Sequence, residues 1–255
     1  MSKEKLGVTL MGGLGVLACA VFVMLPPIAQ PLEYHNFSDA QTWLGVPHFW
    51  NVVSNVPFLV VGLLGLYKLK VARSLQLNKE NELACFLFFL GVSLVALGSG
   101  YYHLSPDNLT LVWDRLPMTI AFMALVSIIV SEYLSTTWGK RLLFPLLMLG
   151  GLSVAYWYYT ETQGQGDLRP YALVQFIPML FMPIILLCFR SRYTNARCYW
   201  YLLLGYVAAK LFEHFDVLVY SVLGFMGGHP LKHVAAAVGV YFLLRGYEQR
   251  RINDC

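Results

Sequence analysis

The 255-residue chain contains little charge. Asp, Glu, Lys and Arg together make up 13% of it, whereas about a quarter of an average soluble domain is charged. Hydrophobic residues make up 58%, and apolar runs of the length that a helix needs to cross a bilayer recur along the whole sequence. These runs do not alternate as the strands of a membrane β-barrel do. The composition therefore predicts an all-α membrane protein.

The sequence also lacks several familiar metal and nucleic-acid signatures. Its five cysteines form no Cys-x-x-Cys pair, so we expect neither a thiolate metal site nor a disulfide framework. No His-Glu-x-x-His motif is present, which disfavours a zinc protease because the glutamate that acts as its general base is missing. The net charge of +4 comes from basic residues spread over loops, so no nucleic-acid partner is expected.

Eight apolar runs are bounded by Gly, Pro, Asn, Asp and charged residues, as turns between helices should be. The first run could be a secretory signal, but its length and its lack of a small-residue cleavage site favour a transmembrane helix. We expect helices over residues 7–25, 49–69, 83–103, 113–134, 142–159, 170–189, 199–222 and 230–246.

The basic residues predict the orientation of these helices, because cytoplasmic loops are enriched in Lys and Arg. With eight spans and a cytoplasmic N-terminus, only Arg115, Arg169 and Lys232 fall at the outer boundary, and Lys210 lies within a helix. The other 14 of the 18 basic residues are inside: Lys3, Lys5, Lys68, Lys70, Arg73, Lys79, Lys140, Arg141, Arg190, Arg192, Arg197, Arg245, Arg250 and Arg251. Both termini are then cytoplasmic.

This orientation brings three polar stretches to the same depth near the outer face. The third predicted helix ends at His103, the fourth begins near Asp114, and the eighth begins near His229. Ser99 lies four residues before His103, and His229 lies four residues before His233, so each pair shares one face of its helix. Polar groups at membrane depth are costly and usually functional, so we expect the three stretches to form one site.

The residue types at this site are those of catalytic zinc. The positive end of the last helix disfavours imidazolium, which leaves His229 and His233 neutral. Three neutral imidazoles, with His103 as the third, leave one position of a tetrahedral zinc ion open for water. We therefore expect one zinc ion per chain, with Asp114 accepting or orienting the proton of the water and Ser99 donating to the developing oxyanion.

Each of these residues also has a simpler interpretation when it is taken alone. A single histidine at a helix end is most often structural. Asp114 could be a helix N-cap, and Ser99 could be a small packing residue between Gly98 and Gly100. The joint occurrence of the residues favours the site.

Two further polar sets could support the site. One begins the second predicted helix, where His48, Asn51 and Asn55 share a face and could give hydrogen-bond support to the site or to helix packing. The other lies in the seventh, where Lys210 and Glu213 can form a structural ion pair, and Asp216 or His214 could instead support the metal ligands.

Together these motifs resemble the alkaline ceramidases and the wider superfamily of seven-helix membrane hydrolases that includes the progestin and adipoQ receptors. The resemblance rests on the segment 51–55 (Asn-Val-Val-Ser-Asn), Ser99-x-x-x-His103, Asp114 and His229-x-x-x-His233, and it spans about residues 48–240. It implies a seven-helix domain over residues 31–255, preceded by an extra transmembrane helix in residues 1–30.

The resemblance also implies the chemistry. It makes His103, His229 and His233 zinc ligands and Ser99 and Asp114 catalytic, in the hydrolysis of the amide bond of a ceramide-like sphingolipid. The chain departs from the family at Lys232, where the eukaryotic ceramidases have an aromatic residue, so Lys232 could contact an anionic head group or reach the aqueous boundary.

A second departure concerns calcium, which an acidic cluster before the first shared helix binds in the ceramidases. Here that region has only Glu33 and Asp39, with His48 in place of an acidic ligand, which leaves calcium doubtful.

Two other functions would also use histidines in membrane helices. A haem-binding electron carrier is not expected, because haem takes ligands from opposite sides and His229 and His233 share a face. A receptor-like protein with a structural zinc site would keep the three histidines without needing the carboxylate of Asp114.

Overall fold

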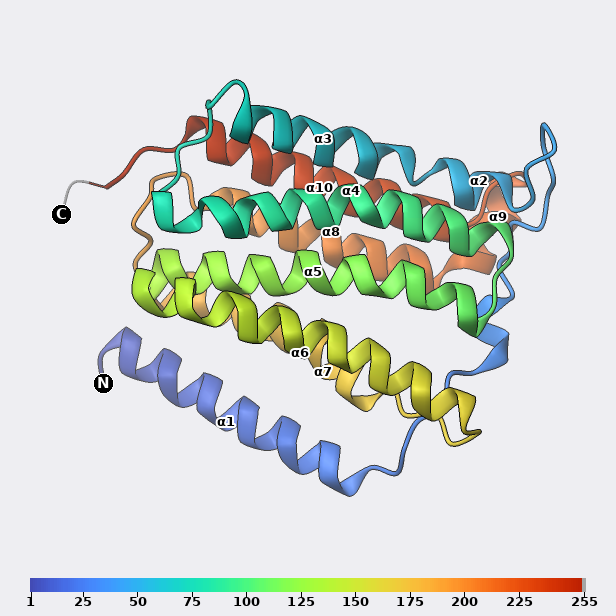
Figure 1. The fold of residues 1–255 in the computed structure, drawn as a ribbon, viewed down its shortest axis with the longest axis horizontal. Helices are drawn as coiled ribbons and strands as arrows, with labels where there is room; N and C mark the ends of the chain where they lie inside the picture. Colours follow the sequence, from blue (N-terminus) through green and yellow to red (C-terminus); the bar gives the residue numbers. More distant parts are fainter. Residues whose placement is uncertain (254–255) are drawn as a thin grey trace.

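The computed structural model describes residues 1–253, and the regular secondary structure in this part of the chain is helical. The long helices lie side by side in one bundle (Figure 1). The elements are α1 (Lys3–Met24), η1 (Leu32–His35), α2 (Phe49–Val53), α3 (Val56–Lys70), η2 (Lys79–Asn81), α4 (Glu82–Leu104), α5 (Asn108–Tyr133), α6 (Thr136–Thr162), α7 (Arg169–Cys188), α8 (Arg197–His214), α9 (Asp216–Leu223) and α10 (Gly228–Gln249).

Within residues 1–253, six helical segments are long and apolar enough to cross a membrane, which makes the chain a multi-pass membrane protein. They are α1, α2 continued by α3, α4, α5, α6 and α7. The remaining two long helices, α8 and α10, run alongside them (Figure 1) and contain charged residues such as Glu213 and Lys232, which lower their apolar character.

The seventh predicted helix is wrong in one respect, because residues 199–222 do not form a single helix. The chain breaks at Phe215, between the end of α8 and the start of α9. The carboxylate of Asp216 accepts hydrogen bonds from the backbone N–H groups of Ser38, at 2.9 Å, and His229, at 2.7 Å. These two bonds tie the break to the loop before α2 and to the start of α10.

The fourth and fifth helical stretches start earlier than apolarity indicates. Helix α5 begins at Asn108, because Asp107 caps it by accepting a hydrogen bond of 2.6 Å from the backbone of Thr110. Helix α6 begins at Thr136 with Ser135 as its cap. Capping side chains are polar, so a search for apolar runs misses the turns that follow them.

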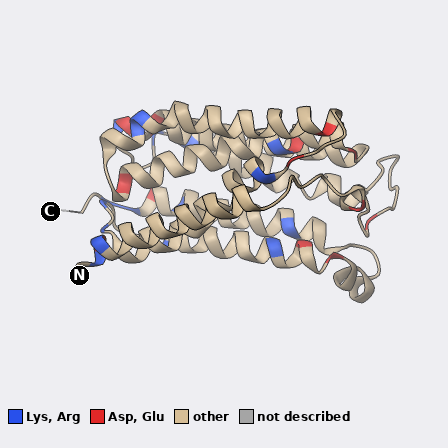
Figure 2. Ribbon diagram, turned by 90° about the horizontal axis from the view of Figure 1, so that it is seen from below, with Lys and Arg blue, Asp and Glu red and all other residues tan. Residues whose placement is uncertain are grey.

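The two ends of the bundle differ. The N-terminus and the described end of the chain lie at the same end, and the links α4–α5 and α6–α7 lie at the other (Figure 1). Lys and Arg occur at the end with the termini, and basic and acidic residues also lie farther along the helices (Figure 2). At the terminal end, Arg250 and Glu132 form a buried ion pair of 2.8 Å that holds the C-terminal segment against α5.

Close helix contacts fix the opposite end, where the histidines lie. A Cβ atom at Gly98 of α4 would overlap the carbonyl oxygen of Trp113 in α5, and one at Gly228 of α10 would overlap the carbonyl oxygen of Phe212 in α8. Glycine therefore lets α4 approach α5, and α10 approach α8, at the level of the site. Gly100 has open space around it, so it makes no such contact.

Candidate metal centre

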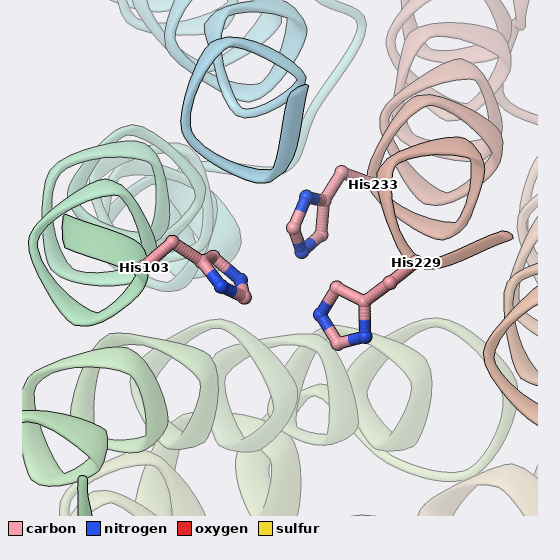
Figure 3. A group of neighbouring side chains, drawn as sticks. All are labelled: His103, His229 and His233. Atoms are coloured by element: carbon pink, nitrogen blue, oxygen red, sulfur yellow. The ribbon is translucent and has the colours of Figure 1, made fainter. Parts of the chain in front are cut away.

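Three imidazoles from two helices converge at this end of the bundle (Figure 3). His103 comes from the last turn of α4, and His229 and His233 come from the first two turns of α10. Their ring centroids lie 4.9, 5.2 and 5.0 Å apart, and one nitrogen from each ring lies within 4.8 Å of the others. The predicted convergence of these three histidines is confirmed, and the cluster could hold a metal ion.

The surroundings of the cluster fit a metal better than a structural hydrogen-bond network. The three side chains are buried, and Nδ1 of His103 has no hydrogen-bond partner among the described residues. Phe37 covers the rings of His103 and His229, with centroid distances of 4.8 and 4.3 Å. Three imidazoles in an apolar enclosure are a donor set that a transition-metal ion could use.

Ser54 orients one of the three rings. Its hydroxyl lies 2.8 Å from Nδ1 of His233 and donates to the backbone carbonyl of Asn51 at 3.2 Å. When the hydroxyl donates to Asn51, the ring donates its Nδ1 proton to Ser54, and Nε2 is the nitrogen with a free lone pair. A hydrogen bond to the non-ligating nitrogen is the usual support of a metal-binding histidine.

Asn51 and Asn55 are the residues from which the sequence predicts such support. The structure gives neither amide a hydrogen bond to a histidine ring: Asn55 donates to the backbone carbonyl of Asn51 at 2.8 Å, and the Asn51 amide has no partner among the described residues. Ser54 belongs to the same motif, but only the packing of α2 against α10 shows that it faces His233.

Replacing Ser54 with Ala is expected to weaken zinc binding by roughly 10- to 100-fold, because the His233 ring loses the bond that fixes its tautomer and orientation. Competition with a chelating indicator would measure this. Ser93→Ala is the matched control, since Ser93 is also a buried serine but donates to its own helix at Phe89. Equal zinc affinities in the two variants would contradict a role for Ser54.

Asp216 supports the centre through the backbone. The bond from the His229 N–H to its carboxylate holds the first turn of α10, on which both His229 and His233 depend. The other candidate from this region, His214, is exposed at the end of α8 and lies outside the histidine cluster.

Ser99 and Asp114 line a cavity of about 400 Å³ together with His233. Ser99 is buried, and its hydroxyl lies near the carboxylate of Asp114 without the geometry of a regular hydrogen bond. Asp114 lies in the second turn of α5, whose cap is Asp107, so the alternative that Asp114 is the N-cap is wrong. Both side chains are therefore placed where a ligand in the cavity could meet them.

The rest of the cavity is mostly apolar and runs into the bundle between α4, α5, α7, α8 and α10. Its volume is in the range of small-molecule sites in proteins. The lining includes Phe88, Val92, Leu125, Met179 and Val240. Such a surface suits a hydrocarbon chain.

Two lysines share one carboxylate at the polar end of the cavity. Glu213 lies 2.5 Å from Lys210 and 2.8 Å from Lys232. The expected pairing of Lys210 with Glu213 is confirmed. Lys232 also pairs with Glu213 and lines the cavity rather than ending at the aqueous boundary.

The acidic residue Asp39 takes part in local structure. Its carboxylate accepts hydrogen bonds from the backbone N–H groups of Asn51, at 3.1 Å, and Gln41, at 3.3 Å, and its backbone carbonyl lies 2.7 Å from Nδ1 of His48. Asp39 and His48 thus fix the start of α2 and, through it, the position of Ser54.

Comparisons with known proteins identify the family of the chain. A search of curated proteins found no significant match. The model of the Ceramidase family matches residues 44–253, which include the histidine cluster, Ser54, Ser99 and Asp114 and leave α1 outside. Because the match covers most of the sequence, the chain belongs to the Ceramidase family.

Proposed function

We propose that this protein is a zinc-dependent hydrolase that cleaves the amide bond of a ceramide-like lipid in the membrane and releases a free fatty acid and an amine-bearing lipid. Membership of the Ceramidase family implies hydrolysis of a lipid amide. The observation that carries the proposal is the buried cluster of His103, His229 and His233 beside a largely apolar cavity that Ser99 and Asp114 also line.

Zinc held by the three histidines would polarise the amide and lower the pKa of water to about 7. In the proposed reaction, Asp114 accepts the proton of the attacking water and returns it to the amide nitrogen as the C–N bond breaks. Ser99 donates a hydrogen bond to the amide oxygen as negative charge develops there. The acyl chain lies in the apolar part of the cavity, which places the scissile amide next to these two side chains.

Replacing Ser99 with Ala is expected to lower the rate of hydrolysis by roughly 10²–10³-fold, the usual cost of losing one oxyanion donor. Zinc content should not change, because Ser99 is not a metal ligand in this proposal. Fatty-acid release at saturating substrate would measure the effect, with Ser93→Ala as the control. A rate equal to that of the control would assign Ser99 to packing only.

We also propose that the chain spans the membrane eight times, with residues 1–30 as an added helix, residues 31–255 as the ceramidase-like domain, both termini in the cytoplasm and the site near the outer face. The common position of the two ends in the bundle and the distribution of Lys and Arg support this topology.

A reporter that is active only in the cytoplasm is expected to give a signal when it is fused to the C-terminus. A reporter that is active only outside should stay silent at the same position. The reverse pattern would overturn the topology and move the site to the inner face.

The experiment that tests the proposed function is lipid mass spectrometry after the purified, zinc-loaded protein is incubated with a mixed extract of amide and ester lipids. Loss of an amide lipid with matched gain of a fatty acid and an amine supports the proposal. No release from any lipid, with the zinc still bound, would favour a receptor-like protein with a structural zinc site.

A further inference from the structure

Arg115 is a buried cation in the wall of the cavity. Its side chain is only 6% exposed, and it follows Asp114 on α5. Nη2 donates to the side-chain oxygen of Gln30 at 2.6 Å, whereas Nη1 has no hydrogen-bond partner among residues 1–253. Burying a charge is costly unless it is paired, so this guanidinium needs an explanation.

Aromatic rings surround Arg115, and the carboxylate of Glu161 accepts hydrogen bonds from two of its neighbours, Gln30 and Trp157. The guanidinium carbon lies 4.2 Å from the ring centroid of Trp157 and 4.7 Å from that of Tyr171. Within the described residues Arg115 forms no ion pair with a carboxylate. Cation–π contacts hold a guanidinium in place but leave its planar donors free for an anion.

Lys232 brings a second positive charge to the same cavity. It shares Glu213 with Lys210, so two ammonium groups meet one carboxylate. Burial raises the pKa of the Tyr34 phenol. The positive charges of Lys232 and Arg115 oppose that rise, and the negative charges of Glu213 and Asp114 add to it. Tyr34 also lines the cavity, so the two cations act on one part of its wall.

We propose that Arg115 and Lys232 form a subsite for an anionic group, a carboxylate or a phosphate, on the head of the lipid whose acyl chain occupies the cavity. This inference rests on the proposed function, because it takes the cavity to be the lipid site. The guanidinium supplies paired donors that match the two oxygens of such a group, and the ammonium supplies a point charge. The preferred substrate is then a ceramide-like amide that carries an anionic group on its head.

Binding to the metal-free protein tests the subsite apart from hydrolysis. The protein is kept in nanodiscs of neutral lipid with a chelator, and affinities are measured by calorimetry for N-octanoylglycine, N-octanoylphosphoethanolamine and the neutral N-octanoylethanolamine. Both acidic amides are expected to bind at least about tenfold more tightly than the neutral one, because a charge-assisted hydrogen bond contributes that much to the affinity. Equal affinities for all three would overturn the subsite.

Two variants identify the cations responsible. Arg115→Gln and Lys232→Gln are each expected to lose most of the preference for the acidic amides while keeping their affinity for the neutral one. If Arg115→Gln does not fold, Lys232→Gln decides alone. Arg169→Gln is the matched control, because Arg169 also lies near this end and is already paired with Asp167 at 2.8 Å. A preference that survives in Arg115→Gln and Lys232→Gln would contradict the proposal.

Free octanoate separates a head-group site from a site for the product. If octanoate is the only anion whose affinity depends on Arg115, the subsite holds the carboxylate of the released fatty acid, and the head-group proposal is wrong. The proposed function is judged separately by hydrolysis. If the zinc-loaded protein cleaves neutral amides but shows no preference for anions, the proposed function stands and the subsite is wrong. If the protein prefers the acidic amides but cleaves no lipid, the subsite stands and the proposed function is wrong.

Discussion

Replacing His103, His229 or His233 with Ala is expected to remove the zinc and abolish hydrolysis. The wild-type protein should contain about one zinc per chain, because the three rings supply the three protein ligands of an open site. With one ring missing, two ligands remain, and the metal should be lost during purification. Elemental analysis of each purified variant measures this directly.

His214→Ala serves as the control for these variants, since His214 is exposed and lies outside the cluster. It should keep the zinc content of the wild type. Unchanged zinc in all three cluster variants would show that the metal, if bound, lies elsewhere.

Replacing Asp114 with Asn is expected to lower the rate of hydrolysis by roughly 10²–10⁴-fold, the typical contribution of a general base. Asparagine keeps the shape and much of the hydrogen bonding of the side chain but cannot take a proton from the attacking water. The zinc content should stay at the wild-type level, because Asp114 is not part of the histidine cluster. Fatty-acid release and elemental analysis on the same preparation give both values.

Asp107→Asn is the matched control for this variant. Asp107 is the N-cap of α5, and Asn caps a helix as well as Asp does. The zinc content and the rate of hydrolysis of this variant should therefore equal those of the wild type. If Asp114→Asn hydrolyses lipid as fast as Asp107→Asn, the carboxylate is not the base and the proposed mechanism is wrong.

The convergence of the histidines could be predicted because it depends on simple periodicities. The bias of Lys and Arg sets which helix ends share a side of the membrane, and a spacing of four residues sets which side chains share a helix face. His103 and His229 lie at the ends of long apolar helices, so an error of a few residues in a helix boundary did not separate them.

The parts that could not be predicted depend on contacts between segments distant in the sequence. Ser54 faces His233 only because α2 packs near the start of α10, and no local pattern distinguishes Ser54 from Asn51 or Asn55. The break at Phe215 depends likewise on the hydrogen bonds of Asp216 to Ser38 and His229. Both residues act on the site through packing, which periodicity does not report.

The surroundings of Arg115 also could not be predicted from the sequence. In the sequence it is one of a few basic residues at the outer boundary, where a side chain can reach water. In the structure it turns inward among Tyr34, Trp157 and Tyr171 and lines the cavity. These rings come from η1, α6 and α7, which no local pattern places beside Arg115.

The most direct test of a zinc-dependent lipid amidase is fatty-acid release from a single amide lipid by one preparation in three states: as purified, after chelation, and after zinc is returned. Release is expected to stop when the metal is removed and to recover when about one zinc per chain is restored. Release that continues unchanged in the metal-free protein would contradict the proposed function.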